Sequence, residues 1–348
     1  MYPEKRKIII FKTDGLGDFL HLAGCIKTIR ENFLNAHITL VCSSTNYQLA
    51  KNYPMINTFI IIDKFNFLKT LLINFKSFFS IRYDYLFILD AKKRSFKLAY
   101  LVKSKNKNTI CFVKQKKILG FNYQLSRPSK IILKIFFNNF VLSDENYLNT
   151  EVVYQNLYFK LLTQIDLKIN SKQNFFILDP EYKKIFNSFY NKFLKKEYYL
   201  IHIDNRWDKY NLKDITNTLN LIKIISKKKF VIITTGVASF NFLKEFENKF
   251  PTYKFLDNCF HENNSLKFNN VCLIKFMPLN LLPYFIINSK KNISSHTGLI
   301  VNISSAFNIE IVDIIKKDKF NELGRWIPLV ANYKRVSFEN LEHQINDF

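Results

Sequence analysis

The chain of 348 residues is 48% hydrophobic and 23% charged, which is ordinary for a globular protein of about two domains. Its formal net charge of +24 is not ordinary and indicates anionic partners. The five cysteines are scattered without C-x-x-C spacing, which argues against a disulfide framework or a zinc site. The cysteine pattern predicts a reduced compartment. Because no apolar run reaches the length of a membrane-spanning helix, we expect a cytoplasmic protein.

The chain opens with a predicted strand, glycine loop, helix and strand. Residues 7–12 form a short apolar run that turns through Asp14-Gly15 and Gly17. Apolar positions then recur at helical spacing from Phe19, which predicts a helix that begins at Asp18. A β-branched run at 38–42 completes a βαβ unit, whose ligands are expected at the carboxyl ends of its strands.

Strands and helices continue to alternate, which predicts parallel sheets covered on both faces. In the first half the pattern predicts strands at 59–62, 85–89 and 109–113 and helices at 46–52, 65–80 and 145–163. In the second half it predicts strands at 198–203, 230–234, 271–274, 291–294 and 309–315 and helices at 212–226, 240–250, 279–287 and from 297 to 306. Residues 165–196 are polar, with Asp179-Pro180 as a turn signal. We therefore predict a first domain at 1–168, a second at 169–335 and a tail helix at 336–348.

Residues 91–130 hold 12 lysines and arginines and no acidic residue. Such a block attracts phosphate, whether on nucleic acid, an anionic membrane or a phosphorylated glycolipid. The alternative is a solvated lysine-rich face. Lys92, Lys93 and Arg94 lie in this block, directly after the predicted strand 85–89.

Asp18 is the first candidate catalytic residue. Gly15-Leu16-Gly17 is not a dinucleotide-binding fingerprint, because the third glycine is missing. A carboxylate at the start of a helix repels a pyrophosphate, but it stays ionised and fixed by backbone N–H groups, as a general base requires. The alternative is an ordinary helix cap.

Two loops of the second half are candidate anion sites. Arg206, Asp208 and Lys209 follow the strand 198–203, and the two cations suit a diphosphate. Thr297-Gly298 opens a helix after the strand 291–294, where free N–H groups form an anion seat. The alternatives are an exposed polar loop and plain capping by Thr297. The sequence has no carboxylate pair or His/Cys cluster typical of a metal site.

Three segments, in order, resemble glycosyltransferase family 9, the ADP-heptose:lipopolysaccharide heptosyltransferases. Residues 12–21, which include Thr13, Asp14 and His21, look like the family's N-terminal loop and helix. Residues 202–209 resemble its phosphate-binding loop, and Thr297-Gly298-Leu299 resembles its donor-site helix start. Gly236 sits where the family has a strand-end glycine turn.

The resemblance implies a GT-B fold, in which two Rossmann-like domains with parallel sheets face each other across a cleft. The first would bind the acceptor, with residues 12–21 and the cations Lys92, Lys93 and Arg94 on the acceptor side, and the second would bind the nucleotide-sugar. It implies inverting transfer from a nucleotide-sugar without a metal or other cofactor, with ADP-heptose as one candidate donor. Asp18 would be the general base, and Lys209 with Arg206 would stabilise the departing diphosphate. The acceptor would be a phosphorylated, lipid-linked glycan at the inner face of the bacterial membrane, where the protein would be peripheral.

The sequence departs from the family at two positions. His296 stands where the family usually has Asp, and Val301 where it usually has His, so the donor sugar is left open. Two other readings compete with sugar transfer: a basic nucleic-acid-binding protein and an inactive GT-B scaffold. Against nucleic-acid binding, we place the basic charge in loops and find no nucleic-acid-binding motif. Against an inactive scaffold, Asp18, Arg206 and Lys209 are all present together.

Overall fold

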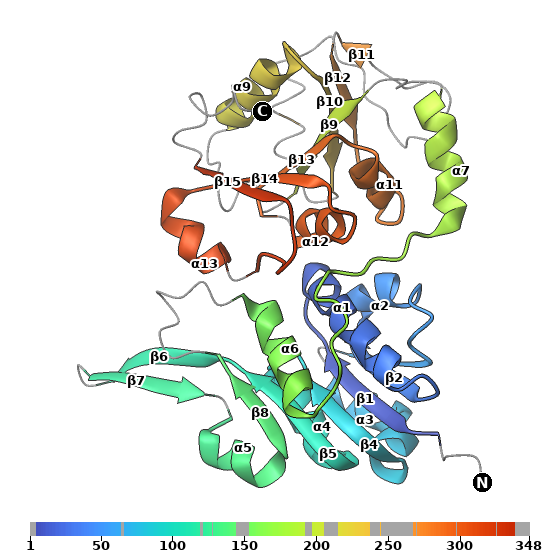
Figure 1. Ribbon diagram of the computed structural model, residues 1–348, viewed down its shortest axis with the longest axis vertical. Coiled ribbons are helices and arrows are strands. Elements are labelled where there is room, and N and C mark those ends of the chain that lie inside the picture. Colours follow the sequence, from blue (N-terminus) through green and yellow to red (C-terminus); the bar gives the residue numbers. More distant parts are fainter. Residues whose placement is uncertain are drawn as a thin grey trace. The chain divides into compact units, whose positions relative to one another are not determined.

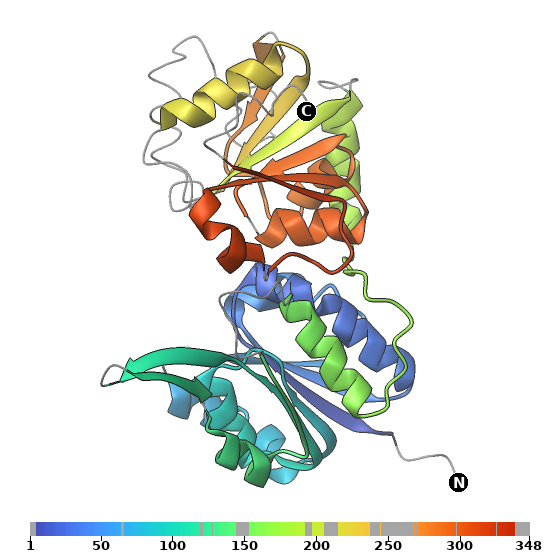
Figure 2. The same cartoon turned by 60° about the vertical axis from the view of Figure 1, so that its left-hand side comes forward.

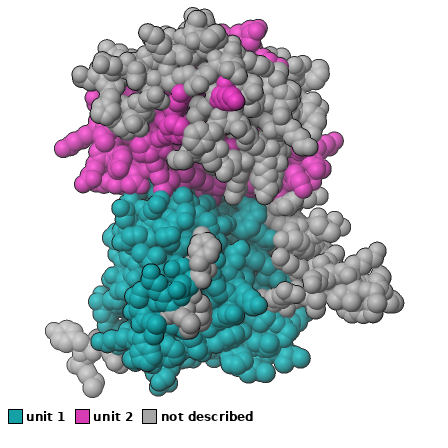
Figure 3. Space-filling model, turned by 180° about the vertical axis from the view of Figure 1, so that it is seen from behind, with its two compact units in different colours: residues 1–177, 324–329 teal, residues 178–323, 330–348 magenta. Residues whose placement is uncertain are grey.

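The computed structural model describes residues 5–63, 66–118, 121–126, 128–143, 153–191, 197–204, 215–236, 244, 267–268, 270–296, 298–324 and 326–337. The chain divides into two compact units (Figure 3). Unit 1 comprises residues 1–177 and 324–329, and unit 2 comprises 178–323 and 330–348. Within the described residues, no helix is both long and apolar enough to cross a bilayer.

Unit 1 is built on a six-stranded sheet whose strands are all parallel (Figure 1). The order is β3 (Thr58–Ile62), β2 (His37–Ser43), β1 (Lys7–Lys12), β4 (Arg82–Ile88), β5 (Lys103–Cys111) and β8 (Asn139–Leu142). Ile8, Ile9, Ile10 and Phe11 of β1 are all fully buried, because helices cover the sheet on both faces. A separate antiparallel hairpin consists of β6 (Val113–Ile118) and β7 (Phe121–Ser126).

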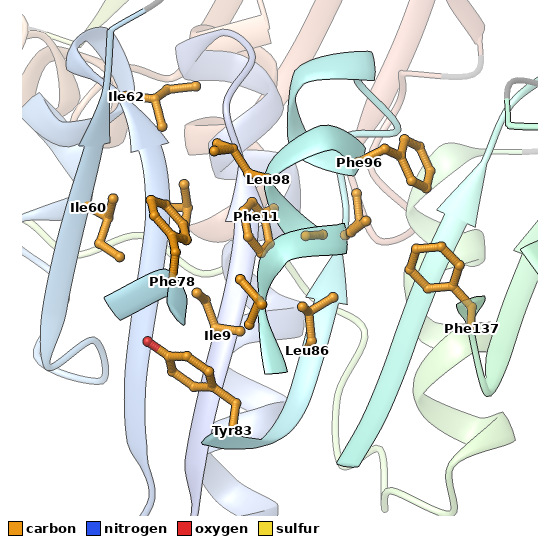
Figure 4. Packing of buried hydrophobic residues seen from close by; sticks show 14 of the residues in the cluster. Ile9, Phe11, Ile60, Ile62, Phe78, Tyr83, Leu86, Phe96, Leu98 and Phe137 are labelled. Carbon is orange, nitrogen blue, oxygen red and sulfur yellow. The ribbon is translucent and has the colours of Figure 1, made fainter. Parts of the chain in front are cut away.

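Alternate side chains of the sheet face two helical layers. Helices α1 (Leu16–Asn32) and α6 (Tyr154–Gln164) lie together on one side (Figure 2). On the other side, Ile9 and Phe11 pack in one apolar cluster with residues from three helical segments, including Phe78 and Phe96 (Figure 4). These segments are α3 (Phe67–Ile73) with the π-helical turn η1 (Lys76–Ser80), α4 (Lys93–Leu101) and α5 (Lys130–Phe136).

The Gln155 side chain on α6 joins three segments of unit 1 that are distant in sequence. Its amide nitrogen donates to the His21 carbonyl on α1 at 3.4 Å and to Asn174 Oδ1 at 2.6 Å. Its amide oxygen accepts from the Leu329 backbone N–H at 2.8 Å. Residues 324–329 therefore return to unit 1 late in the chain.

Unit 2 repeats the plan with a seven-stranded sheet. The order is β11 (Lys267–Phe268), β12 (Val271–Ile274), β10 (Phe230–Thr235), β9 (Tyr198–Ile203), β13 (Lys291–Ser294), β14 (Glu310–Ile315) and β15 (Tyr333–Ser337). All pairs are parallel except β11 with β12. The helical segments are α7 (Pro180–Phe189), α9 (Ile215–Ser226), α11 (Leu282–Ile287), α12 (Gly298–Ala306), η3 (Lys317–Lys319) and α13 (Phe320–Gly324).

Several predicted elements differ from the structure. The basic block is not in loops: it runs through α4, β5, β6 and β7. The first residues of β5 are mostly lysine and asparagine, which have low strand propensity, so backbone pairing with β4 and β8 stabilises this part of the strand. Asp179-Pro180 is a helix start, with Asp179 as the N-cap of α7 and Pro180 at its first position. The predicted helix 65–80 is divided at Asn74 into α3 and η1.

The division into units also differs in detail from the predicted boundary. It falls between Ile177 and Leu178, later than the predicted 168, and the predicted tail at 336–348 begins inside β15. The rest of that tail and the predicted helix 240–250, apart from Lys244, lie outside the described residues. α6 begins at Tyr154, well inside the predicted helix 145–163, whose residues 145–152 also lie outside the described range.

Candidate active site

In unit 1, a cavity of about 370 Å³ lies where the chain turns away from β1 and β4. β2 and β5 flank this pair on opposite sides, so the connections after β1 and β4 diverge, and such a switch point is where ligands bind in parallel sheets. The lining residues are Asp14, Gly15, Asp18, Thr45, Lys92 and Arg94. Five of these six are residues that the sequence predicted for the acceptor side or for catalysis.

Asp18 enters this cavity from the first turn of α1. The helix begins at Leu16 instead of Asp18, with Gly15 as the N-cap, so Asp18 is the third helical residue. Its Oδ2 accepts the Gly15 N–H at 3.1 Å, and a Cβ on residue 15 would approach the same oxygen to 3.2 Å. Gly17 lies half-buried in the same turn. The carboxylate is therefore held by the backbone and remains half-buried at the cavity wall, as a general base requires.

Asp90, which follows β4 after Leu89, fixes the loop that carries Asp14. Its Oδ2 accepts the Thr13 N–H at 2.9 Å and the Ser95 hydroxyl at 2.6 Å, and its Oδ1 accepts the Lys92 N–H at 3.0 Å. Arg94 also binds Thr13: its Nε donates to the Thr13 hydroxyl at 2.7 Å and its Nη2 donates to the Thr13 carbonyl. These bonds set the positions of Lys92 and Arg94 at the cavity.

Lys12 and Asp14 form a buried ion pair beside the cavity. Lys12 Nζ donates to Asp14 Oδ2 at 3.0 Å, to the Leu89 carbonyl at 3.2 Å and to the Tyr158 hydroxyl at 3.1 Å. Burial alone would lower the pKa of Lys12, but the charge of Asp14 raises it above its ordinary value. Burial raises the pKa of Asp14 to about 7, against the attraction of Lys12 and with the support of Asp18 and Asp90. The raised pKa of Asp14 thus lies near neutral pH, at the wall of this cavity.

A second cavity of about 440 Å³ adjoins the first, because Lys92 and Arg94 line both. Its other lining residues come from the end of β3, from α3 and from α4: Ile62, Asp63, Thr70, Lys93, Lys97 and Leu98. Four cations and one carboxylate make it strongly positive. Lys93 therefore belongs to this neighbouring cavity.

His21 does not line either cavity. It is buried on α1, where its ring lies 6.1 Å from that of Tyr158 and 6.2 Å from that of Trp326. Its predicted place in the acceptor-side loop reflects its nearness to Asp18 in sequence. In the structure it belongs to the packing between α1, α6 and residues 324–329.

In unit 2, the corresponding switch point lies between β9 and β13. His296 follows β13 with a left-handed φ of 53°, and its Nδ1 lies 2.8 Å from Asp313 Oδ2 on β14. Asp313 also accepts from Ser294 Oγ at 2.9 Å, from the His296 N–H and from the Tyr333 hydroxyl. Burial would raise the pKa of Asp313, but the His296 ring and these hydrogen bonds lower it below its ordinary value.

The remaining predicted donor-side residues are only partly described. Gly298 is the first residue of α12 and Leu299 the second, both half-buried, and Val301 is buried farther along the helix. Gly236 directly follows β10 and donates its N–H to the Ile203 carbonyl at 3.1 Å. Arg206, Asp208, Lys209 and Thr297 lie outside the described residues.

The residues that support these two switch points were not predicted from the sequence. Lys12, Asp90 and Ser95 support the first, and Asp313 and Tyr333 support the second. The signal for Asp90 and for Asp313 was an acidic residue at or near the carboxyl end of an apolar strand. It could not be interpreted without the strand order, which brings β1 beside β4 and β13 beside β14.

No protein-family model and no curated protein matches this sequence. Solved structures do match its fold. A family 9 glycosyltransferase from Veillonella parvula has a TM-score of 0.70 at 13% identity, covering 100% of this chain and 90% of that one. The E. coli heptosyltransferase WaaC, solved with ADP, has a TM-score of 0.65 at 12% identity, covering 98% and 99%.

A UDP-GlcNAc 2-epimerase from Methanocaldococcus jannaschii is also similar, with a TM-score of 0.54 at 12% identity, covering 98% of this chain and 92% of that one. At these identities, the likeness concerns the fold. It agrees with the predicted resemblance and with two Rossmann-like sheets in tandem. The chain has the fold of family 9 glycosyltransferases.

Proposed function

We propose that this protein is an inverting glycosyltransferase that moves a sugar from a nucleoside-diphosphate donor to a hydroxyl group of a surface glycan. The observation that carries the proposal is the position of Asp18. Its carboxylate is fixed by the Gly15 N–H at the wall of a cavity at the switch point of unit 1. The fold of family 9 glycosyltransferases supports it.

In the proposed reaction, the Asp18 carboxylate accepts the proton of the acceptor hydroxyl. The hydroxyl oxygen then attacks the anomeric carbon, and the bond from that carbon to the diphosphate oxygen breaks with inversion. Negative charge develops on the departing nucleoside diphosphate. Lys209, Arg206 and the N–H groups at the start of α12 would stabilise this charge without a metal ion.

The donor and acceptor are proposed by chemical class. An E. coli neighbour was solved with ADP, which supports a nucleotide in the donor site, and ADP-heptose is one candidate. His296 stands at the position where the family has a carboxylate, and its ring pairs with Asp313. This difference argues for a different sugar. The cations Lys92, Lys93 and Arg94 suit an anionic acceptor, such as a phosphorylated lipid-linked glycan of the lipopolysaccharide type at the inner membrane face.

A thermal-shift panel of nucleotides and nucleotide-sugars tests the donor class, because a ligand that binds the folded state raises the melting temperature by mass action. We expect one base and one sugar to give the largest shift, and Lys209→Ala to reduce it. Absence of a shift with every nucleotide-sugar would contradict the proposal. An epimerase would instead convert the donor without any acceptor, which chromatography of the donor detects.

A further inference from the structure

The helices on one side of the unit 1 sheet form a layer whose composition differs from that of the rest of the described chain. We call it the outer helical layer and define it as residues 67–80, 93–101 and 130–136, which are α3, η1, α4 and α5. Its inward side chains share one apolar cluster with the sheet (Figure 4). These segments contain no Asp or Glu, and their cations are Lys69, Lys76, Lys93, Arg94, Lys97, Lys130 and Lys134.

The same layer exposes most of the large apolar side chains that the described residues leave in water. Eleven are exposed in all, and the three outside the layer are Leu34, Ile61 and Val330. The eight within it are Leu72, Ile73, Phe75, Leu101, Ile131, Ile132, Ile135 and Phe136. Leu72 is 76% exposed, Ile131 72% and Ile135 69%. A cluster of this kind on a soluble surface marks a binding face.

Helix α5 shows the pattern most clearly. Of its seven residues, only Leu133 is buried, whereas Ile131 and Ile135 face water beside Lys130 and Lys134. Phe136 packs its ring 4.8 Å from that of Tyr100 on α4, so the two helices present one continuous surface. Isoleucines flanked by lysines match a lipid interface, where apolar side chains enter the acyl boundary and lysines reach the phosphates.

We propose that the outer helical layer is the surface by which this protein docks on an anionic lipid bilayer. Charge complementarity selects the bilayer, since the layer has seven cations and no carboxylate. A nucleic acid would engage the lysines but leave Ile131 and Ile135 in water. The layer also reaches the positive cavity of Lys93 and Lys97, which adjoins the cavity of Asp18. A lipid-anchored acceptor could therefore approach the carboxylate from this side.

This inference deepens the membrane part of the proposed function, but its test does not require sugar transfer. The full chain is mixed with vesicles of phosphatidylcholine, alone or with phosphatidylglycerol, and bound protein is measured by flotation. We expect binding only to the anionic vesicles, weakened by added salt. Failure to bind them overturns the inference, whereas loss of donor binding with intact vesicle binding would contradict only the proposed reaction.

Matched variants locate the surface. Ile131→Gln with Ile135→Gln changes only highly exposed side chains, and should weaken vesicle binding by about tenfold or more without changing the melting temperature. Leu34→Gln is the control, because Leu34 is 74% exposed but lies outside the layer. This variant should bind vesicles as the parent does. Equal binding by the double variant, or equal loss in the control, contradicts the assignment.

The charges have their own matched pair. Lys130→Gln with Lys134→Gln should weaken binding to anionic vesicles, whereas Lys168→Gln with Lys172→Gln, exposed elsewhere in unit 1, should not. Size-exclusion chromatography tests the alternative that a second copy of the chain occupies the outer helical layer. A dimer that Ile131→Gln with Ile135→Gln converts to monomer, without vesicle binding by the parent, would show a self-association face and overturn the lipid assignment.

Discussion

The Thr13 hydroxyl donates to Asp90 Oδ2 at 2.6 Å across the ends of two neighbouring strands. The two residues are 77 positions apart in the chain, and their backbones diverge directly afterwards. The Thr13 N–H donates to the same carboxylate oxygen at 2.9 Å. The opening of the unit 1 cavity is therefore held by a buried carboxylate with several donors, which suits a site whose geometry must not change with each ligand.

Asp90→Ala should destabilise unit 1 by more than the lost volume of the Asp90 side chain alone would. The substitution leaves the Thr13, Ser95 and Lys92 donors without an acceptor, at a cost of about 1–3 kcal/mol for each buried group. Urea unfolding followed by circular dichroism measures the loss. Thr13→Val is the control, because it removes the hydroxyl bonds but keeps the backbone N–H bond, and it should cost less. Equal losses would contradict this account of Asp90.

Asp18→Asn should remove most of the proposed transfer activity while folding is kept. The amide oxygen can still accept the Gly15 N–H, but the side chain can no longer take a proton, and a general base contributes roughly 10²–10⁴-fold. Turnover of the donor in the presence of acceptor measures the effect. Asp63→Asn is a matched control in the neighbouring cavity and should retain activity. An active Asp18→Asn variant would end the assignment of the base.

Asp14 should make the stability of the protein fall between about pH 4 and 7. Burial raises its pKa from 3.8 to about 7 on folding, so over this window the folded state binds more protons than the unfolded state. The stabilisation that protonated Asp14 gives to the folded state is complete below the pKa of the unfolded state. It is lost as pH rises through the pKa of the folded state. The slope should reach about 1.4 kcal/mol per pH unit. Unfolding at several pH values should show a shallower slope in Asp14→Asn, and identical slopes would contradict the prediction.

Gly24→Ala should be destabilising by about 1–3 kcal/mol, although alanine favours helices. A Cβ at position 24 of α1 would lie 2.6 Å from the Gln173 carbonyl oxygen, and that backbone segment must move away. The adjacent Tyr53 hydroxyl bond to the Phe175 carbonyl, at 3.1 Å, would be disturbed with it. Thermal unfolding checks this. A melting temperature equal to or above that of the parent would show that the segment yields without cost.

Most of the sheet could be predicted from the sequence, because its central strands are apolar runs with β-branched residues. The strands Tyr198–Ile203, Val271–Ile274 and Lys291–Ser294 have the predicted bounds. Only the end of β5 was predicted, as part of the strand 109–113, because its first residues are mostly lysine and asparagine, which have low strand propensity, and are held by pairing with β4 and β8. The hairpin of β6 and β7 was not predicted, because β6 is mostly lysine and glutamine and is held by its pairing with β7.

The candidate site divides in the same way. Local chemistry identified Asp18 and Gly15, whose hydrogen bond spans three residues and follows from a glycine before a helix. The partners of Thr13 and His296 could not be found, because Asp90 and Asp313 reach them only through the order of strands in each sheet. The roles of Arg206 and Lys209 stay predictions, because both lie outside the described residues.

The Gln155 side chain has a consequence for anyone who divides this protein. A fragment that stops at Ile177 would omit Leu329, whose N–H satisfies the buried Gln155 amide oxygen. It would also omit Trp326, whose ring lies 4.4 Å from that of Tyr154 on the same helix. The first half of the gene therefore does not encode a whole folding unit, and a fragment of unit 1 should carry residues 324–329 through a grafted linker or a permuted chain.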